Sequence, residues 1–299
     1  MKSFSVVVLT YNNYKLLNLA FKSLASQCLT EEMYSQLVII DDGTENLKES
    51  DILQLIDMYD LTSKYDVKLI INKKNIGTVK SFNKAISHCE GELIIPLSAD
   101  DEFYDESVIF DIVDFFEKNK DVEIVTFLRA PIVNGVEQQP LPHPKLWSLF
   151  NDPRKLYDYI SLMGNVISGA STYYRRTFLS NRKFNESYRY IEDFPLYLDY
   201  LYSGKKIHIF NRLAIKYSTS GISSKITRNS LIYNDYKKIW LNVLALNDRR
   251  GFYYKRFVYF SHVLTDEEKL SMFNFLMYMD IILFRVSFKI IKKIRGMIK

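Results

Sequence analysis

Short apolar runs alternate with amphipathic stretches over the first 128 residues. Runs rich in Val, Ile and Leu predict buried strands at 5–10, 37–40, 67–71, 92–97 and 123–128. Between them, apolar residues recur at helical spacing and predict helices at 14–27, 50–59, 78–89 and 106–119. Strands that alternate with helices favour an α/β domain with a largely parallel sheet.

The pattern changes after residue 128. Residues 130–155 contain five prolines and predict a long loop or flap. Further on, the pattern predicts a strand at 168–174, a helix that begins at Asp193-Phe194-Pro195, and short strands at 206–210 and 215–218. From about residue 230 the pattern is mostly helical. We therefore expect an α/β domain over 1–225 and a helical region over 226–299.

Composition narrows the class of protein. The chain has 299 residues, of which 47% are hydrophobic and 25% charged, as in an ordinary soluble globular protein. This balance excludes a disordered chain or a collagen-like repeat. The two cysteines, Cys28 and Cys89, do not suggest a disulfide scaffold. We find neither a signal peptide nor a run of ~20 apolar residues, and we expect a cytoplasmic protein.

The positive charge is concentrated in residues 285–299. The net charge is +5, and this tail contains no acidic residue and six basic ones: Arg285, Lys289, Lys292, Lys293, Arg295 and Lys299. The rest of the chain is nearly neutral, which argues against a nucleic-acid partner. Isoleucines lie opposite the basic residues, so the tail could lie as an amphipathic helix on an anionic membrane surface. The alternative is a helix that packs its apolar side on the body of the protein.

Polar clusters follow four of the predicted strands. They are Thr10-Tyr11-Asn12, Asp41-Asp42, Asn75-x-Gly77 and Asp100-Asp101. The carboxyl ends of parallel strands meet at one edge of a sheet, and ligands bind there. We therefore expect these clusters to form one binding site.

The acidic pairs suggest specific chemistry, each with a simpler alternative. Adjacent carboxylates such as Asp100 and Asp101 suit Mg²⁺ or Mn²⁺ held against a phosphate, unless one caps a helix and the other is solvated. Asp41-Asp42-Gly43 could bind a base or ribose, or simply form a turn.

Glu192-Asp193 precedes the helix that begins with proline. Asp193 could be the N-cap of that helix, a general base that deprotonates a hydroxyl group, or both. The four histidines have no metal-ligand spacing, and the chain lacks Gly-x-Ser-x-Gly, Walker and Gly-x-Gly-x-x-Gly motifs. Serine hydrolases of the elbow type, P-loop enzymes and ordinary dehydrogenases therefore lose support.

Five segments, in the right order, resemble the motifs of family 2 glycosyltransferases. They are 6–12, 38–44, Asn75-Ile76-Gly77 with Asn83 after it, 97–101 and 191–193. The resemblance covers about residues 4–220. It implies a GT-A fold, which is a Rossmann-like, mostly parallel sheet flanked by helices, with residues 1–225 as the nucleotide-sugar-binding and catalytic domain. It also implies a nucleotide-sugar donor, with a UDP-sugar favoured, and an inverting displacement.

The resemblance implies a role for each residue of this chain that matches a family motif. Thr10, Tyr11 and Asn12 would line the nucleotide pocket. Asp42, with Asp41, would bind the uracil or ribose, and Asn75 and Gly77 would shape the nucleotide site. Asp100, with Asp101 beside it, would be the main ligand of Mn²⁺ or Mg²⁺, and Asp193 would be the catalytic base.

The chain departs from the family pattern in the aspartate motif at residues 97–101, which is expected to bind the metal. Many members of the family carry aspartate at one or both of the positions held here by Ser98 and Ala99. The missing negative charge predicts weaker metal binding, and it leaves open a catalytically degenerate member that serves as a partner subunit. The retained Asp193 argues for activity.

We therefore expect a metal-dependent hexosyltransferase that transfers a sugar to a saccharide acceptor carried by a lipid, and that thereby extends a capsule or another surface polysaccharide. A nucleotidyltransferase that makes a nucleotide sugar is the alternative from another enzyme class. Thr10-Tyr11-Asn12-Asn13 lacks the glycines and the basic residue that such enzymes usually carry in their opening loop. The apolar C-terminal region could serve either a homodimer or the inner face of a cell membrane.

Overall fold

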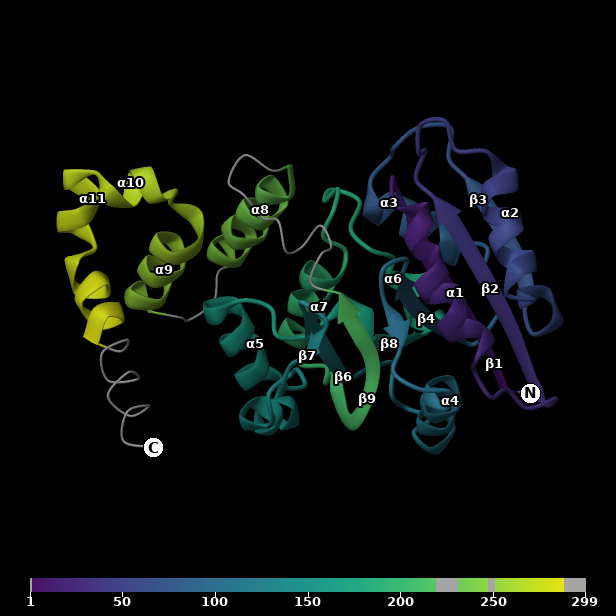
Figure 1. Cartoon of the computed structure of the whole chain (residues 1–299). Helices are drawn as coiled ribbons and strands as arrows, with labels where there is room; N and C mark the ends of the chain where they lie inside the picture. Colours follow the sequence, from purple (N-terminus) through teal and green to yellow (C-terminus); the bar gives the residue numbers. More distant parts are fainter. Residues whose placement is uncertain (1, 219–230, 247–250, 288–299) are drawn as a thin grey trace. The chain divides into compact units, whose positions relative to one another are not determined.

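The computed structural model describes residues 2–218, 231–246 and 251–287. The chain forms two compact units (Figure 1). The first consists of Met1–Ile160 and Gly164–Ile226, and the second of Ser161–Met163 and Thr227–Lys299. The predicted domain boundary at residues 225 and 226 stays a prediction.

The first unit is built on a nine-stranded sheet with the order β3-β2-β1-β4-β8-β6-β9-β5, and β7 pairs with β6. The strands are β1 Lys2–Thr10, β2 Met33–Asp41, β3 Asp66–Ile71, β4 Leu93–Ser98, β5 Glu102–Phe103, β6 Ile124–Val133, β7 Val136–Glu137, β8 Thr172–Arg175 and β9 His208–Ser218. Strands β3, β2, β1 and β4 are parallel, as predicted. The other half of the sheet is mixed, because β8 runs antiparallel to both β4 and β6.

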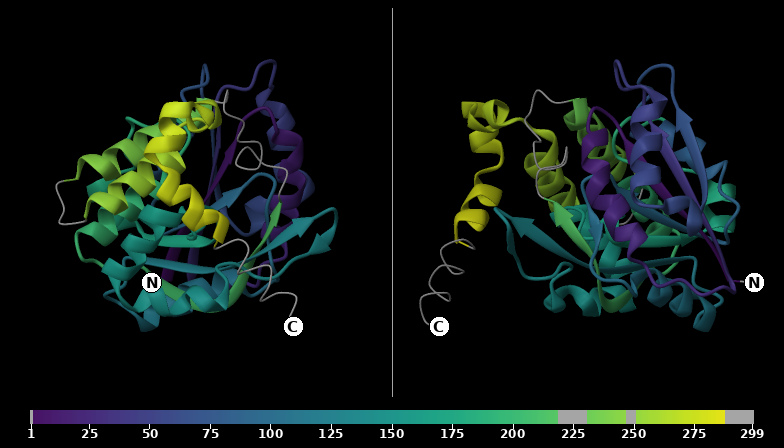
Figure 2. Two further views of the ribbon diagram at one scale, coloured as in Figure 1. Left: turned by 90° about the vertical axis from the view of Figure 1, so that its left-hand side faces the viewer. Right: turned by 45° about the vertical axis from the view of Figure 1, so that its right-hand side comes forward.

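Helices cover both faces of this sheet (Figure 2). The α-helices of the first unit are α1 Leu17–Ala25, α2 Glu49–Met58, α3 Thr78–Ile86, α4 Val108–Lys118, α6 Arg176–Arg182 and α7 Asp193–Tyr202. A further helix, α5 Pro153–Met163, belongs to the first unit up to Ile160 and to the second from Ser161. Short 3₁₀ helices are η1 Tyr14–Leu16, η2 Leu61–Ser63, η3 Pro144–Asn151 and η4 Gly169–Ser171.

Alternation along the strands explains the two layers of helices. Val6 and Val8 of β1 join one buried core with side chains of α1, α2 and α4. Val7 points to the opposite face, where it lines a pocket with Phe82 of α3. Both faces of the parallel half are therefore buried, which is why its strands are almost continuously apolar.

Two predictions about the second half of this unit were wrong. The predicted loop at 130–155 contains the end of β6, the short β7, η3 and the start of α5. Pro131 stays within β6 because its carbonyl oxygen still accepts a hydrogen bond from the backbone N–H of Gln138 at 2.8 Å. The two strands predicted at 206–210 and 215–218 are one strand, β9, which pairs with β6 through register shifts.

The second unit is helical, as predicted. Its helices are α8 Leu231–Ala245, α9 Phe252–Val258, the π-helix η6 Tyr259–Val263, α10 Asp266–Leu270 and α11 Met272–Met277. Phe260, Leu264 and Ile281 form its small buried core. Of the predicted basic tail at 285–299, all but the first three residues lie outside the described residues. Within the described residues, none of the helices combines the length and the apolar character needed to cross a membrane.

Candidate functional site

The carboxyl ends of β2, β1 and β4 lie side by side. Thr10 is paired with Asp41 across β1 and β2, and Leu9 is paired with Ser98 across β1 and β4. The backbone N–H of Asp42 donates to the carbonyl oxygen of Thr10 at 2.9 Å. The structure therefore brings the polar clusters that follow these three strands to one edge of the sheet.

Asp42 lies at the centre of a buried hydrogen-bond network. Its side chain is 2% exposed. Oδ1 accepts bonds from the backbone N–H of Ile76 at 2.9 Å, Ser81 Oγ at 2.7 Å and Asn72 Nδ2 at 3.1 Å. Oδ2 accepts one from the backbone N–H of Gly77 at 2.9 Å. The carboxylate thus ties the loop 75–77 to β2, and its oxygens are already engaged within the protein.

Asp41 shapes the turn that follows β2. Its two oxygens accept bonds from the backbone N–H and the hydroxyl group of Thr44, each at 2.7 Å. Thr44 Oγ1 in turn accepts a bond from the backbone N–H of Asn12 at 2.7 Å. Asn12 has a positive φ of 55°, in the left-handed region that asparagine tolerates. This chain of bonds joins the loops after β1 and β2.

Thr10 and Tyr11 are held by a neighbour that the sequence did not single out. Thr10 Oγ1 donates to Asn13 Oδ1 at 2.7 Å, and the backbone N–H of Tyr11 donates to the same oxygen at 3.0 Å. Thr10 is buried, whereas the Tyr11 side chain is 37% exposed. Tyr11 is therefore the member of this cluster that offers an aromatic face to a ligand.

The loop Asn75-Ile76-Gly77 is packed tightly against its surroundings. Gly77 has φ of 94°, and a Cβ atom there would lie 2.8 Å from the carbonyl oxygen of Arg189. Arg189 Nη2 donates to Asn75 Oδ1 at 2.6 Å. A Cβ atom on Gly43 would lie 2.4 Å from the backbone carbon of Lys74. Both glycines are needed for close backbone approach, so the loop is fixed from two sides.

Asp100 and Asp101 differ in burial and in bonding. Asp101 is 1% exposed, and its Oδ1 accepts a bond from the backbone N–H of Ser218 at 2.9 Å. Its Oδ2 is buried and has no hydrogen-bond partner among the described residues. Burial, and then the charge of Asp100, raises the pKa of Asp101 to about 7. Burial also raises the pKa of Asp100, which is half-buried.

The carboxylate oxygens of Asp100 and Asp101 fit a hard divalent cation. A buried carboxylate oxygen without a partner and a second carboxylate beside it are oxygen ligands of the kind that Mg²⁺ and Mn²⁺ prefer. Over the described residues no group of three or more His, Cys, Asp or Glu side chains could hold a metal ion. Water and substrate phosphate would therefore have to supply the remaining ligands, as is usual for Mg²⁺.

Asp193 is held rigidly at the start of α7. Its Oδ2 accepts bonds from the backbone N–H of Gly169 at 3.1 Å and from Asn165 Nδ2 at 3.3 Å. Its Oδ1 accepts a bond from its neighbour's backbone N–H, that of Phe194, at 2.6 Å. Asp193 is the first residue of the helix, and Glu192 occupies the N-cap position. A carboxylate fixed by three donors keeps one orientation, as a general base requires.

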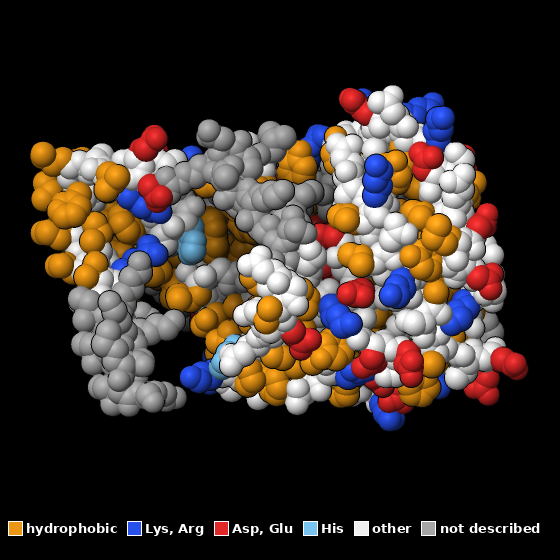
Figure 3. All heavy atoms as spheres, in the orientation of Figure 1, with side chains coloured by type: hydrophobic (Ala, Val, Ile, Leu, Met, Phe, Trp, Pro, Cys, Tyr) orange, Lys and Arg blue, Asp and Glu red, His pale blue; other side chains and the backbone are white. Residues whose placement is uncertain are grey.

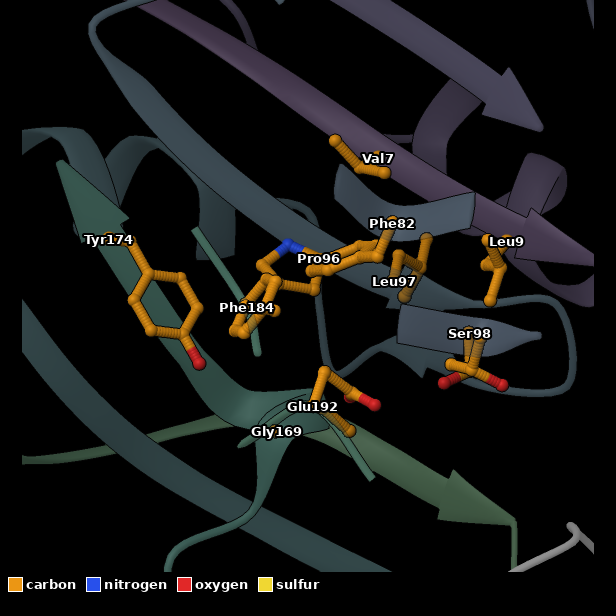
Figure 4. A pocket seen from close by; sticks show the side chains of 12 residues that line it. Val7, Leu9, Phe82, Pro96, Leu97, Ser98, Gly169, Tyr174, Phe184 and Glu192 are labelled. Carbon is orange, nitrogen blue, oxygen red and sulfur yellow. The ribbon is translucent and has the colours of Figure 1, made fainter. Parts of the chain in front are cut away.

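Glu192 precedes Asp193 and lies near the end of β4, the strand that leads to Asp100 and Asp101. It lines a pocket with Ser98 and Gly169, across from Phe82 and Pro96 (Figure 4). Burial and the neighbouring charge of Asp193 raise the pKa of Glu192, and burial raises that of Asp193. The pocket has a volume of about 100 Å³, too small for a sugar nucleotide, so it can form only part of a substrate site.

Several residues of this arrangement could not be found from the sequence. Asn165 and Gly169 hold Asp193 from 28 and 24 positions away, and Arg189 holds Asn75 from 114 positions away. None of them belongs to a recognisable local pattern. Their roles follow only from the contacts between segments that are distant in the chain.

Solved structures share this fold at low sequence identity. A crystal structure of S. aureus TarS matches 91% of the chain with a TM-score of 0.60 and 20% identity. The chain spans 46% of that TarS chain, a little under half its length. TarS 1–349 in complex with UDP-GlcNAc matches 92% of the chain, and 75% of its own length, with a TM-score of 0.60 and 21% identity. The likeness shows the predicted GT-A fold.

Sequence comparison identifies the family. An uncharacterized glycosyltransferase of Haemophilus influenzae is 23% identical over 323 residues, which cover 97% of this chain and 95% of that protein. The model of the family described as glycosyl transferase family 2 matches residues 5–182. That match includes four of the five predicted motifs and more than half of the chain. The chain therefore belongs to glycosyl transferase family 2.

Proposed function

We propose that the protein is an inverting hexosyltransferase that moves a sugar from a nucleoside-diphosphate donor to a hydroxyl group of a saccharide acceptor. A UDP-sugar is the favoured donor, because TarS, which shares the fold, binds UDP-GlcNAc. The family assignment supports glycosyl transfer. The direct displacement is supported by one rigid carboxylate, Asp193, near the edge of the sheet.

The geometry of Asp193 is the observation that carries this proposal. Three donors orient its carboxylate, and the adjacent Glu192 reaches the pocket shared with Ser98 of β4. Asp193 would accept the proton of the acceptor hydroxyl group while that oxygen attacks the anomeric carbon. The bond from the anomeric carbon to the diphosphate oxygen would break on the opposite face, so the configuration inverts.

The donor would lie along the edge formed by the loops after β1, β2 and β3. Thr10, Tyr11 and Asn12 would line the nucleotide pocket, and Asp41 with Asp42 would bind the uracil or ribose directly or through the loop that Asp42 organises. Asn75 and Gly77 would shape this site. Asp100 and Asp101 would hold Mn²⁺ or Mg²⁺, which when bound supplies positive charge for the leaving diphosphate.

Asp193→Asn tests the proposal, with Asp199→Asn as its control. Asp199 is an exposed aspartate on the same helix, so the control makes the same chemical change away from the site. The assay measures release of UDP from UDP-sugars, and calorimetry measures UDP binding. We expect Asp193→Asn to lower turnover by about 10²–10⁴-fold with UDP affinity retained. Equal turnover in Asp193→Asn and the parent protein would refute the assignment.

Two other readings give different results in the same assays. A nucleotidyltransferase would release pyrophosphate from a nucleoside triphosphate and a sugar phosphate. A catalytically degenerate partner subunit would bind UDP or a UDP-sugar and release no product with any acceptor. Neither is favoured by an observation in the structure, and either result would replace the proposed reaction.

We further propose that the acceptor is lipid-linked, as in capsule or other surface-glycan synthesis, and that the second unit contacts an anionic membrane. Ten large apolar side chains are exposed between residues 270 and 286, among them Leu270 and Met272 at 80% and Phe273 at 72%. Figure 3 shows apolar side chains gathered over α11. Six basic residues without any acid follow in sequence at 285–299. Apolar and basic signals together are typical of a peripheral membrane surface.

A vesicle assay tests this contact on the full chain. Vesicles of phosphatidylcholine with phosphatidylglycerol should sediment the parent protein, and binding should weaken with salt and with neutral vesicles. Deleting 285–299, or making Met272→Glu with Phe273→Glu, should lower binding by about tenfold or more. Leu53→Glu, an exposed apolar residue of α2, is the control. Unchanged sedimentation of both altered proteins would exclude the contact, and a concentration-dependent homodimer that these changes dissociate would replace it.

A further inference from the structure

Arg129 lies near the proposed catalytic edge and belongs to none of its motifs. It lies on β6, opposite Ile215 of β9. Its backbone N–H donates to the carbonyl oxygen of Leu141 at 2.9 Å, and its own carbonyl oxygen accepts the N–H of Leu141 at the same distance. The backbone at Arg129 is therefore fixed from both sides, and its side chain starts from a defined position.

The guanidinium group of Arg129 stacks on an aromatic ring and makes no hydrogen bond within the described residues. Its central carbon lies 4.3 Å from the centre of the Tyr217 ring. The described residues contain four other half-buried arginines, and each of them donates to a carbonyl or carboxylate oxygen: Arg175, Arg176, Arg212 and Arg256. Arg129 is half-buried without such an acceptor. Its five N–H donors are available to an external oxygen.

The position of Arg129 relates it to both acidic parts of the site. Tyr217, on which it stacks, is followed by Ser218, whose backbone N–H donates to Asp101 Oδ1. Burial raises the pKa of Asp101 and of Asp193, and the positive charge of Arg129 opposes that rise at both carboxyl groups. One cation therefore acts on the proposed metal ligands and on the proposed base.

We propose that the Arg129 guanidinium binds a phosphoryl oxyanion of a substrate at this edge of the sheet. A planar guanidinium stacked on tyrosine keeps its N–H edge free for two parallel bonds to phosphate oxygens, and phosphate is the anion that arginine recognises in this way. The inference rests on the proposed function, because that function brings phosphate to the site. The oxyanion belongs either to the donor diphosphate or to the phosphate of a lipid-linked acceptor.

The composition of the proposed metal motif, residues 97–101, gives a physical reason for a positive charge at Arg129. Two of the four residues in Ser98-Ala99-Asp100-Asp101, Ser98 and Ala99, carry no negative charge. A site with fewer acids holds a divalent cation less strongly. Arg129, whose charge acts on Asp101, would add positive charge that needs no metal and would act on the same oxyanion.

The test measures binding to the full-length parent, Arg129→Gln, Arg129→Lys and Lys216→Gln. Lys216 is the control because it lies on β9 opposite Ala130, next to the Tyr104 ring, so its change removes the same charge from a neighbouring position. Calorimetry with Mn²⁺ compares UDP, UMP and uridine. Pyrophosphate is then titrated alone and in the presence of saturating UDP, and urea unfolding checks that each variant is folded.

The two sources of the oxyanion give distinct results. If Arg129 contacts the donor diphosphate, Arg129→Gln weakens UDP about 10–100-fold while uridine changes less than about twofold, and Arg129→Lys lies between. If it contacts the acceptor phosphate, UDP affinity is unchanged, and pyrophosphate binding to the UDP-saturated parent is lost in Arg129→Gln. If Arg129→Gln does not fold, Arg129→Lys is measured in its place, and an affinity equal to that of the parent for every ligand counts against the proposal.

Other outcomes separate this inference from the proposed function. Affinities for UDP and pyrophosphate that are unchanged in a folded Arg129→Gln overturn the inference and leave the proposed function intact. A parent that binds no nucleotide overturns the proposed function. In that case the inference survives only if pyrophosphate alone binds and Arg129→Gln abolishes that binding, and it falls if pyrophosphate does not bind.

Discussion

Asp42→Asn separates the structural role of this residue from a direct role in nucleotide binding. The amide can keep its oxygen at the position of Oδ1, where Asn72, Ile76 and Ser81 donate. Its NH₂ group then faces the backbone N–H of Gly77, which now donates to Oδ2. One charge-assisted bond is lost, a buried N–H is left without an acceptor, and two donors face each other.

The magnitude follows from these contacts. Losing a hydrogen bond to a charged group costs about 1.5–3 kcal/mol, and an unpaired buried N–H costs about 1–3 kcal/mol. The two costs overlap, so we expect the free energy of unfolding to fall by about 3 kcal/mol. Ser81→Ala removes one donor to Asp42 and also the acceptor of a bond from Asn72 Nδ2, so it should cost about 1–2 kcal/mol, since the other three bonds to Asp42 remain.

Urea unfolding of the parent, Asp42→Asn and Asp57→Asn measures this difference. Asp57 is an exposed aspartate of α2, so its change should alter the free energy by less than about 0.5 kcal/mol. We expect Asp42→Asn to lose stability and UDP affinity together, because the loop 75–77 loses its anchor. If Asp42→Asn keeps the stability of the parent and still loses UDP affinity, the hydrogen-bond network does not stabilise the fold and the carboxylate contacts the nucleotide directly.

Three further predictions concern the base, the loop and the metal ligands. Burial raises the pKa of Asp193, and a base must be ionised, so kcat/KM should fall with decreasing pH at a pKa above the ordinary aspartate value of about 3.9. Burial and the charge of Asp193 raise the pKa of Glu192 as well, so we expect Glu192 to be protonated when Asp193 ionises. Glu192→Gln should then leave this acidic limb in place, and a limb that moves to lower pH would mean that Glu192 is charged. Gly77→Ala should lower the free energy of unfolding by about 1–3 kcal/mol and weaken UDP binding, because φ of 94° and contact with Arg189 exclude a Cβ atom. Gly135→Ala is the control in the same urea titration, since Gly135 also has a positive φ but has no atom within 4 Å of a Cβ position, so its loss measures the cost of φ alone. Equal losses in the two variants would exclude the packing argument. Asp100→Ala should remove the effect of Mn²⁺ on UDP affinity measured by calorimetry, and an unchanged Mn²⁺ titration would show that this carboxylate is not a ligand.

The amino-acid sequence by itself determined the parallel half of the sheet and the edge at which its polar clusters meet. The apolar runs of β1, β2, β3 and β4 are short, β-branched and separated by amphipathic helices, so local pattern and final structure agree. The sequence also contained the family motifs, because each of them lies within one short segment of the chain. The course of residues 130–155 was not predictable in this way, because β6 continues through proline only where β7 and β9 supply partners.

Only the tertiary structure decided how the site residues are used. Asp41 and Asp42 are adjacent in the chain, yet Asp41 holds its own turn and Asp42 holds a loop more than thirty positions away. Asp193 is oriented by Gly169 and Asn165, and Arg129 stacks on Tyr217, through contacts that no local motif encodes. The physical reason is that hydrogen bonding and ring stacking depend on which atoms meet in space, and distant segments meet only when the sheet has formed.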